Sequence, residues 1–164
     1  MKSKARIFGH GIHPILIVFP FGLLATAVVF DIIYLFSGQT TMIAVAYWML
    51  AAGIVGGLVA SPFGLIDWIA IPKGTRAWNI GLFHGLGNGV VLILFAASWW
   101  LRGDAFRAPS VPALVMSFAG AGLAMVTGWL GGELVQRLGV SVEDRANLNA
   151  PNSLLHPDLA NRKS

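Results

Sequence analysis

The stretch PILIVFPFGLLATAVVFDIIYLF, residues 14–36, decides the fold, because it is 23 residues long and contains a single charged residue, Asp31. A helix needs about 20 mostly apolar residues to cross roughly 30 Å of hydrocarbon. Three further stretches meet this requirement, at residues 41–71, 79–101 and 111–138. Because backbone polar groups inside lipid must be satisfied within the segment, we expect all four to be helices. The short connections predict an all-α, antiparallel four-helix transmembrane bundle.

The composition agrees with a membrane protein and excludes several other classes. Of the 164 residues, 56% are hydrophobic and 11% are charged, and the mean hydropathy is +0.73. A soluble domain carries about 25% charged residues, and a disordered chain has fewer large apolar groups. The absence of cysteine excludes disulfides, thiolate metal sites, cysteine-held iron–sulfur clusters and c-type haem attachment. We expect one transmembrane domain, residues 1–139, followed by a polar tail, residues 140–164.

The basic residues indicate the orientation in the membrane. Nine of the eleven Lys and Arg residues fall in the N-terminal segment, the loop between the second and third spans, or the C-terminal end. Loops rich in Lys and Arg stay on the cytoplasmic side, so both termini are predicted to be cytoplasmic. The basic residues form no stripe interleaved with aromatic residues, which argues against a nucleic-acid partner. The expected surroundings are a lipid bilayer.

All four predicted spans bring a titratable group to one layer near the cytoplasmic side. At 1.5 Å per residue, His84 and Asp67 lie roughly 8 Å inside their spans, and Glu133 lies roughly 6 Å from the basic residue that ends its span. His13 stands at the entry of the first span, and Asn88 shares a helical face with His84. Ionisable groups inside a membrane are costly, so each is a candidate functional residue.

A structural role is the alternative for each of these residues. Asp67 and Glu133 could form interfacial ion pairs with basic residues of the same end, and His13 could cap the helix that Pro14 begins. His84 could make a structural hydrogen bond inside the bundle. Asp31 is expected on a solvated rim at the opposite end of the first span.

Small residues recur at helical spacing in three spans: Gly53, Gly57, Ala60 and Gly64; Gly81, Gly85 and Gly89; and Gly120, Gly128, Gly131 and Gly132. Such ridges permit close packing of membrane helices, or a groove that admits a flat ligand such as a porphyrin or a quinone. The spacing leaves both interpretations open. Pro20 and Pro62 each remove a backbone hydrogen bond, so both are expected to kink their helices.

Three motifs together resemble a bacterial membrane family, domain-of-unknown-function family 2231. They are HPILIVFP (residues 13–20), GLIDWIAIPKGTRAWNIGLFHGLGN (64–88) and TGWLGGELVQRLGVSV (127–142). The resemblance implies a bacterial inner-membrane protein, and the motif residues of the family fall on His13, Asp67, His84, Asn88 and Glu133. Val18 departs from the family pattern, which tends to have a polar residue there. Relatives joined to redox modules suggest a role in membrane electron transfer.

These observations predict a redox-associated or metal-binding membrane protein. In one version His13 and His84 are axial ligands of haem b, Gly81, Gly85 and Asn88 line the cofactor, and an acid orients one imidazole. In the other version His13, His84, Asp67 and Glu133 bind iron, zinc or manganese directly. Two alternatives from other classes stay open: an assembly subunit that docks a membrane partner or a second copy through its glycine faces, and a proton-coupled transporter in which His84 passes protons to Asp67 or Glu133. Whether the protein is an enzyme stays open.

Overall fold

The computed structural model describes residues 1–144 and 146–154 of the chain. A short antiparallel hairpin precedes the helices, and the last span ends in one π-helical turn. The elements are β1 (Arg6–Ile7), β2 (His10–Gly11), α1 (Ile12–Leu16), α2 (Val18–Ser37), α3 (Thr41–Ile69), α4 (Arg76–Arg102), α5 (Val111–Gly132) and η1 (Glu133–Arg137). Among the described residues of the predicted tail, 140–144 and 146–154, none lies in a helix or strand. The rest of that tail, residues 145 and 155–164, lies outside the described part of the chain.

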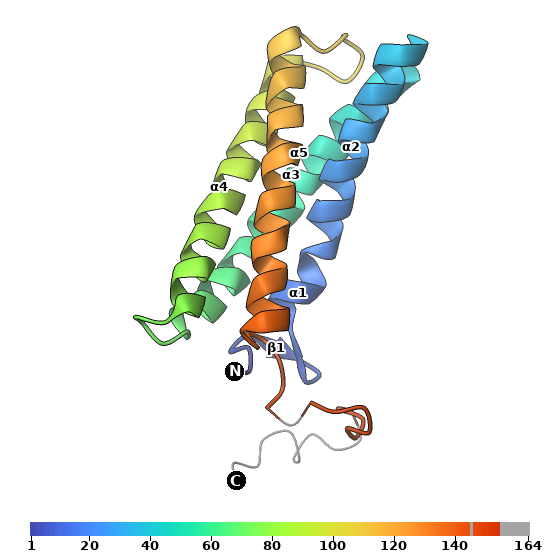
Figure 1. Cartoon of the computed structure of the whole chain (residues 1–164). Coiled ribbons are helices and arrows are strands. Elements are labelled where there is room, and N and C mark those ends of the chain that lie inside the picture. The colour runs from blue at the N-terminus through green and yellow to red at the C-terminus, as the bar shows by residue number, and fades with distance from the viewer. Residues whose placement is uncertain (145, 155–164) are drawn as a thin grey trace.

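The four predicted spans are confirmed. Within the described residues, four helical segments are long and apolar enough to cross a membrane: Ile12–Ser37, Thr41–Ile69, Arg76–Arg102 and Val111–Arg137. They pack as two antiparallel hairpins (Figure 1), with α1 and α2 against α3 in the first and α4 against α5 in the second. Apolar length is sufficient to predict the four helices, because a helix satisfies the backbone hydrogen bonds of such a segment within the segment itself.

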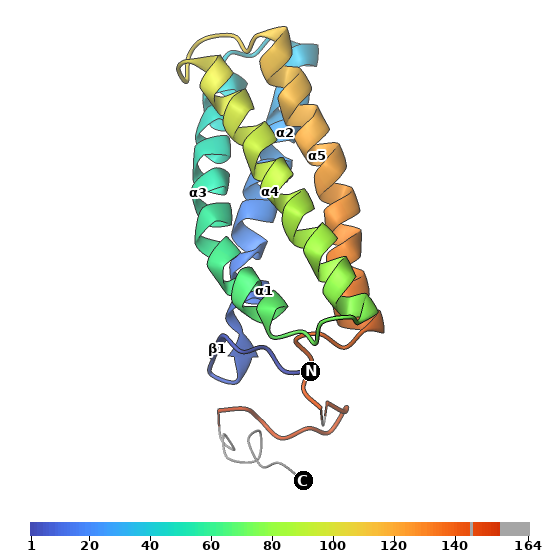
Figure 2. The ribbon, with the colours of Figure 1, turned by 90° about the vertical axis from the view of Figure 1, so that its left-hand side faces the viewer.

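The two ends of the bundle differ. The basal end holds the N-terminal segment, the α3–α4 loop and the residues that follow η1, whereas the distal end holds the α2–α3 and α4–α5 loops (Figure 1). Figure 2 shows the N-terminus and β1 below the helices at the basal end. Assigning the basal end to the cytoplasm stays a prediction from the Lys and Arg distribution.

The prolines affect their helices differently. The first span is interrupted at Ile17, between α1 and α2, one residue after Leu16. Leu16 is the residue whose carbonyl would accept a bond from the missing N–H of Pro20, so the interruption lies where the sequence predicts it. Pro62, in contrast, lies inside α3, which remains one helix from Thr41 to Ile69.

The tightest hydrophobic core lies in the distal half of the bundle. Its buried members come from α2, α3 and α4: Leu24, Ala27, Val28, Leu50, Val91 and Phe95. Glycine makes this packing possible, since a Cβ atom at Gly53 would lie 2.7 Å from the Leu24 side chain and one at Gly57 would lie 2.5 Å from Leu92. These two glycines of the α3 ridge are therefore packing positions within the chain.

A buried ion pair joins the two hairpins near the distal end, and it corrects the prediction for Asp31. The expectation of a solvated rim is wrong, because Asp31 is only 1% exposed. Arg102, which the sequence assigned to a loop, is the last residue of α4 and is also 1% exposed. Its Nη1 and Nη2 atoms donate to the two Asp31 carboxylate oxygens at 2.8 and 2.6 Å. Ser117 of α5 donates to the same carboxylate at 3.3 Å.

Candidate functional site

A cavity of about 840 Å³ lies between the two hairpins in the basal half of the bundle. Cofactor and small-molecule sites commonly have volumes of roughly 300–1,000 Å³. The wall of the cavity is drawn from α1, α3, α4 and α5 and from residues that follow η1. His13 from the first hairpin and His84 from the second both line it. Two of the histidines that the sequence singled out therefore meet in one cavity.

His13 is held by the backbone of α3. The helix begins at Ile12 with Gly11 as its N-cap, so the alternative role of His13 as the cap of a helix that Pro14 begins is wrong. The His13 Nδ1 atom instead lies 3.1 Å from the carbonyl oxygen of Ala60. This contact crosses from α1 to α3 and fixes the ring against the wall of the cavity.

His84 is held in the same way by the backbone of α5. Its Nδ1 atom lies 2.8 Å from the carbonyl oxygen of Thr127. Asn88, one turn further along α4, donates from Nδ2 to the His84 carbonyl oxygen at 2.9 Å. The Asn88 side-chain oxygen accepts a hydrogen bond from the Thr127 hydroxyl at 3.0 Å. Thr127 therefore orients His84 directly and also fixes the amide of Asn88.

These contacts determine which ring nitrogen is free. A carbonyl oxygen only accepts hydrogen bonds, so Nδ1 carries the hydrogen in both imidazoles and Nε2 keeps its lone pair when the ring is neutral. Nε2 of His13 makes no hydrogen bond to any described residue. The Asn88 Nδ2 atom lies 3.4 Å from Nδ1 and 3.2 Å from Nε2 of His84. A donor in line with the Nε2 lone pair would lie much farther from Nδ1, so Asn88 sits beside the ring and does not occupy that lone pair.

Both carbonyl groups are accessible because a glycine stands four residues later on the same helix. In a helix the Cβ atom tilts toward the N-terminus, so a side chain at position i+4 covers the carbonyl of residue i. Gly64 follows Ala60, and Gly131 follows Thr127, at this spacing. A Cβ atom at Gly64 would lie 2.8 Å from Cε1 of His13, and one at Gly131 would lie 2.9 Å from Cε1 of the second imidazole. Gly64 and Gly131 thus leave the space that the rings of His13 and His84 occupy. We call each of these two glycine positions a glycine cradle.

The two histidines also stand at equal distances in sequence from the two members of the distal ion pair. Asp31 follows His13 by eighteen residues, and Arg102 follows His84 by the same number. In the continuous helix α4, eighteen residues at 3.6 residues per turn make five turns and return to the same helical face. Each hairpin therefore presents a histidine at the basal end and one member of the ion pair at the distal end.

Other glycines leave the cavity walls free of side chains. A Cβ atom would meet nothing within 4 Å at the following lining positions: Gly85, Gly89, Gly128 and Gly132. Gly85 was predicted to line a cofactor, and it does lie at the cavity wall. Gly81 also lines the cavity but has a packing role, since its Cβ atom would lie 2.7 Å from Cδ1 of Trp68.

Asp67 lines the cavity but is bound by the N-terminal segment. The Ser3 hydroxyl lies 2.8 Å from each carboxylate oxygen, and the backbone N–H of Lys4 donates to Oδ1 at 2.8 Å. Asp67 is 7% exposed, and the hydrogen-bonding capacity of its carboxylate is largely used. Asp67 thus anchors residues 1–11, which we call the N-terminal strap, to the basal end of α3.

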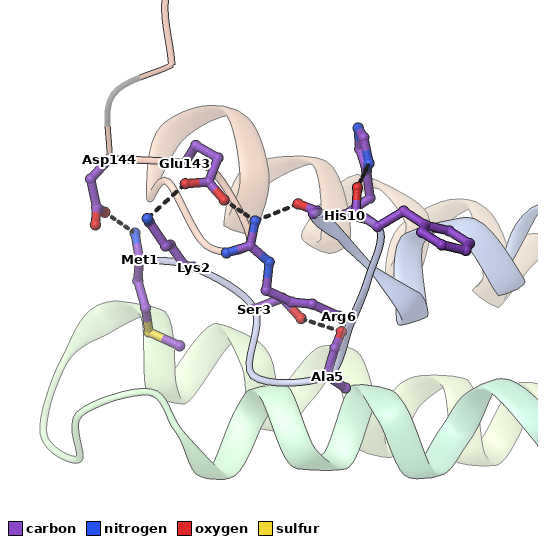
Figure 3. A network of polar contacts seen from close by, with 10 residues as sticks. Met1, Lys2, Ser3, Ala5, Arg6, His10, Glu143 and Asp144 are labelled. Carbon is purple, nitrogen blue, oxygen red and sulfur yellow. Dashed lines mark hydrogen bonds and ion pairs between the residues drawn. The ribbon is translucent and has the colours of Figure 1, made fainter. Parts of the chain in front are cut away.

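The strap is also tied to the residues that follow η1 (Figure 3). Lys2 lies 2.9 Å from the Glu143 carboxylate, and Arg6 pairs with the same group. The Met1 amino group donates to the carbonyl of Gly139 at 2.8 Å. Burial alone would raise the pKa of Glu143, but the neighbouring Lys2 and Arg6 outweigh it and lower the pKa below 4.5. The ion pairs of Glu143 with Lys2 and Arg6 therefore contribute their full stability at a pH above the ordinary pKa of a glutamate. This contribution is lost only as the pH falls through the lowered pKa of Glu143.

Glu133 does not join the two histidines. Its carboxylate pairs with Arg76 at 2.6 Å, and Glu133 is not among the residues that line the cavity. Within residues 1–144 and 146–154, no group of three or more His, Cys, Asp or Glu side chains could hold a metal ion. The structure thus brings His13 and His84 together in one cavity, with Asp67 tied to the strap and Glu133 paired elsewhere. The four-residue metal set expected from His13, Asp67, His84 and Glu133 is not formed.

Sequence reasoning missed three contributors to the site: Thr127, Ala60 and the strap. Thr127 is one of two hydroxyl residues in α5 and, unlike Ser117, stands four residues before a glycine, and that pattern could have identified it. Ala60 acts only through its carbonyl group, so its side chain carried no signal. The strap depends on tertiary contacts of a short segment and had no periodicity to detect.

The comparisons with known proteins agree with the membrane assignment. A family model described as "Predicted membrane protein (DUF2231)" matches residues 9–144. No curated protein and no solved structure matches the chain. The match includes both histidines, both glycine cradles and the buried ion pair. The chain is therefore a member of the DUF2231 family of predicted membrane proteins.

Proposed function

We propose that this protein binds a b-type haem between its two hairpins, with His13 and His84 as axial ligands, and takes part in membrane electron transfer. The observation that carries the proposal is the pair of imidazoles that line one cavity, each with Nδ1 hydrogen-bonded to a backbone carbonyl. This arrangement leaves Nε2 as the coordinating atom in both rings, as in many metal-bound histidines.

The number of available ligands favours haem over a non-haem metal ion. A haem requires only one or two axial ligands from the protein, because the porphyrin supplies the other four. A protein-bound zinc site usually takes three or four protein ligands. Asp67 and Glu133 are engaged with the strap and with Arg76, so two imidazoles remain. Direct binding of iron, zinc or manganese by all four residues has correspondingly less support.

The cavity walls also suit a flat, apolar ligand. Four lining glycines have open space where a Cβ atom would lie, and most other lining side chains are apolar. Thr127 and Ala60 orient the ligand imidazoles through their carbonyl groups, and Asn88 supports His84. A bound haem would supply one-electron chemistry, while the chain holds the ring, orients the imidazoles and excludes water.

The other two functional classes have less support from the contacts. The ring of His84 bonds the Thr127 carbonyl and its backbone carbonyl accepts from Asn88, so no described contact links it to Asp67 or Glu133 as a proton relay would require. Part of the glycine ridge on α3 packs within the chain, on Leu24 and Leu92, which leaves less of it for a membrane partner.

Titration with haem in mild detergent tests the proposal. We expect the wild-type protein to bind one haem per chain and to give the absorption spectrum of a six-coordinate, bis-imidazole haem. His13→Ala and His84→Ala should each lose this spectrum. His10→Ala is the matched control, because His10 is exposed and its Nδ1 bonds the nearby Phe8 carbonyl outside the cavity. Equal haem binding by the wild type and by both cavity variants would refute the proposal.

A further inference from the structure

We infer that the cavity receives its ligand from the lipid phase, through an opening between the hairpins, and that the N-terminal strap seals it from water at the basal end. This inference deepens the proposed function and rests on it for the identity of the ligand as haem. The route of entry is argued from the exposure of the residues that line the cavity and from the contacts of the N-terminal strap, and neither observation involves a ligand.

Buried residues cover much of the basal part of the cavity wall. Four lining residues near this end are buried, Asp67, Ile71, Leu134 and Val140, whereas the lining residues Pro14 and Val135 are exposed. Three of them, Ile71, Leu134 and Val140, pack together as one hydrophobic cluster. The fourth, Asp67, is covered by Ser3 and Lys4 of the strap. The two layers, apolar cluster and strap, lie between the cavity and the basal surface.

The strap is fastened by contacts on both sides of the bundle. On one side Asp67 of α3 binds Ser3 and the Lys4 backbone. On the other side Glu143 pairs with Lys2 and Arg6 (Figure 3). Because the second set is ionic and partly exposed, salt screens it, whereas the buried Asp67 contacts resist salt.

The opposite part of the wall is open at the depth of the hydrocarbon. The lining residues Leu58, Gly85, Leu86, Gly89 and Gly128 are all exposed. Gly89 lies thirteen residues into the 27-residue helix α4, close to its midpoint, or roughly 20 Å along it. A residue exposed at the middle of a membrane span faces acyl chains. A ligand that partitions into the bilayer can therefore reach the imidazoles sideways.

The chemistry of the wall agrees with this route. The opening is lined by glycine and leucine and bears no charge, so a charged, water-soluble ligand would lose its hydration there without compensation. The porphyrin ring of a haem is planar and apolar and loses little on passing between glycines, and only its two propionates carry charge. The inference thus assigns the site to a membrane-partitioned, planar ligand.

Nitroxide accessibility tests the route without any haem, and the cysteine-free chain provides a clean background. Single variants Gly85→Cys and Gly132→Cys place a spin label in the cavity at positions where a side chain meets open space. In vesicles, we expect both labels to collide several-fold more often with oxygen, which dissolves in lipid, than with a water-soluble nickel chelate. Gly22→Cys, on an exposed open position of α2, is the lipid-facing control, and Lys73→Cys, in the α3–α4 loop, is the aqueous control.

The strap is tested by adding Glu143→Gln and Asp67→Asn to the Gly132→Cys protein. We expect nickel accessibility at this label to rise several-fold when the strap is unfastened, with the circular dichroism of the helices unchanged. High nickel accessibility at both labels with the strap intact would overturn the inference. Unchanged nickel accessibility at the Gly132→Cys label after Glu143→Gln and Asp67→Asn would also overturn it. Neither result affects the haem titration, so the route of entry and the binding of haem can be refuted independently.

Discussion

Replacing Arg102 with alanine is expected to lower the free energy of unfolding by about 3–5 kcal/mol, the largest effect on stability among the substitutions considered. The variant leaves Asp31 as an unpaired buried carboxylate, and it removes both bonds of the bidentate pair. The Ser117 hydroxyl would remain as a donor to Asp31, at 3.3 Å. One neutral hydrogen bond cannot replace the guanidinium group, so α4 loses its connection to α2 at the distal end.

Equilibrium unfolding in mixed micelles, followed by circular dichroism, measures this effect. Arg107→Ala is the matched control, since Arg107 is exposed in the loop that follows the same helix. The double variant Asp31→Leu, Arg102→Met removes both charges, and it should unfold with a much smaller loss than the single variant. A single variant as stable as the Arg107→Ala control would show that the buried pair does not form.

The second large effect is expected from a single methyl group behind His84. Gly131→Ala would place a Cβ atom 2.9 Å from Cε1 of the imidazole, so the ring must leave its position on the Thr127 carbonyl. Partners that orient a metal ligand typically contribute about 10–100-fold to affinity. We expect Gly131→Ala to weaken haem binding by that factor, and Gly64→Ala to do the same through His13.

Gly128→Ala is the control for this prediction, because it lies on the same helix and lines the same cavity but has open space at its Cβ position. Its affinity for haem should remain near that of the wild type. Alanine also favours a helix over glycine, so neither variant should unfold more easily for reasons of propensity. If Gly131→Ala and Gly128→Ala bind haem equally, the cradle behind His84 has no role in binding.

Much of the fold could be predicted from the sequence, because a membrane imposes few solutions. The spans follow from apolar length, and the interruption at Ile17 follows from Pro20. The meeting of His13 and His84 in one cavity agrees with their similar depth in neighbouring spans. Depth is readable from sequence because it accumulates at a fixed rise per residue.

The pairing of side chains across helices could not be predicted in the same way. It depends on the rotation of each helix about its axis, which apolar composition does not determine. Asp31 and Arg102 were therefore assigned to a rim and a loop, although they form a buried pair. The equal spacing of His13 to Asp31 and of His84 to Arg102 was a usable signal, since it places Asp31 and Arg102 at the same distance along their spans.

The acids near the basal end show a second limit. Asp67 and Glu133 lie at the depth of the histidines, yet their partners are Ser3 and Arg76. The Ser3 contact spans 64 residues of sequence and depends on how the strap folds across the bundle. A depth argument selects candidates within a layer, but it cannot distinguish an acid that faces a cavity freely from one that another segment has already bound.

The most direct test of the central claim is the spin state of ferric haem bound to the protein, measured by electron paramagnetic resonance. We expect a low-spin signal from two imidazole ligands in the wild type, and a high-spin, five-coordinate signal in both His13→Gly and His84→Gly. Added imidazole should restore the low-spin signal in both variants, because it can enter the space that either side chain leaves. A low-spin signal that persists in either variant without added imidazole would contradict ligation by the two hairpins together.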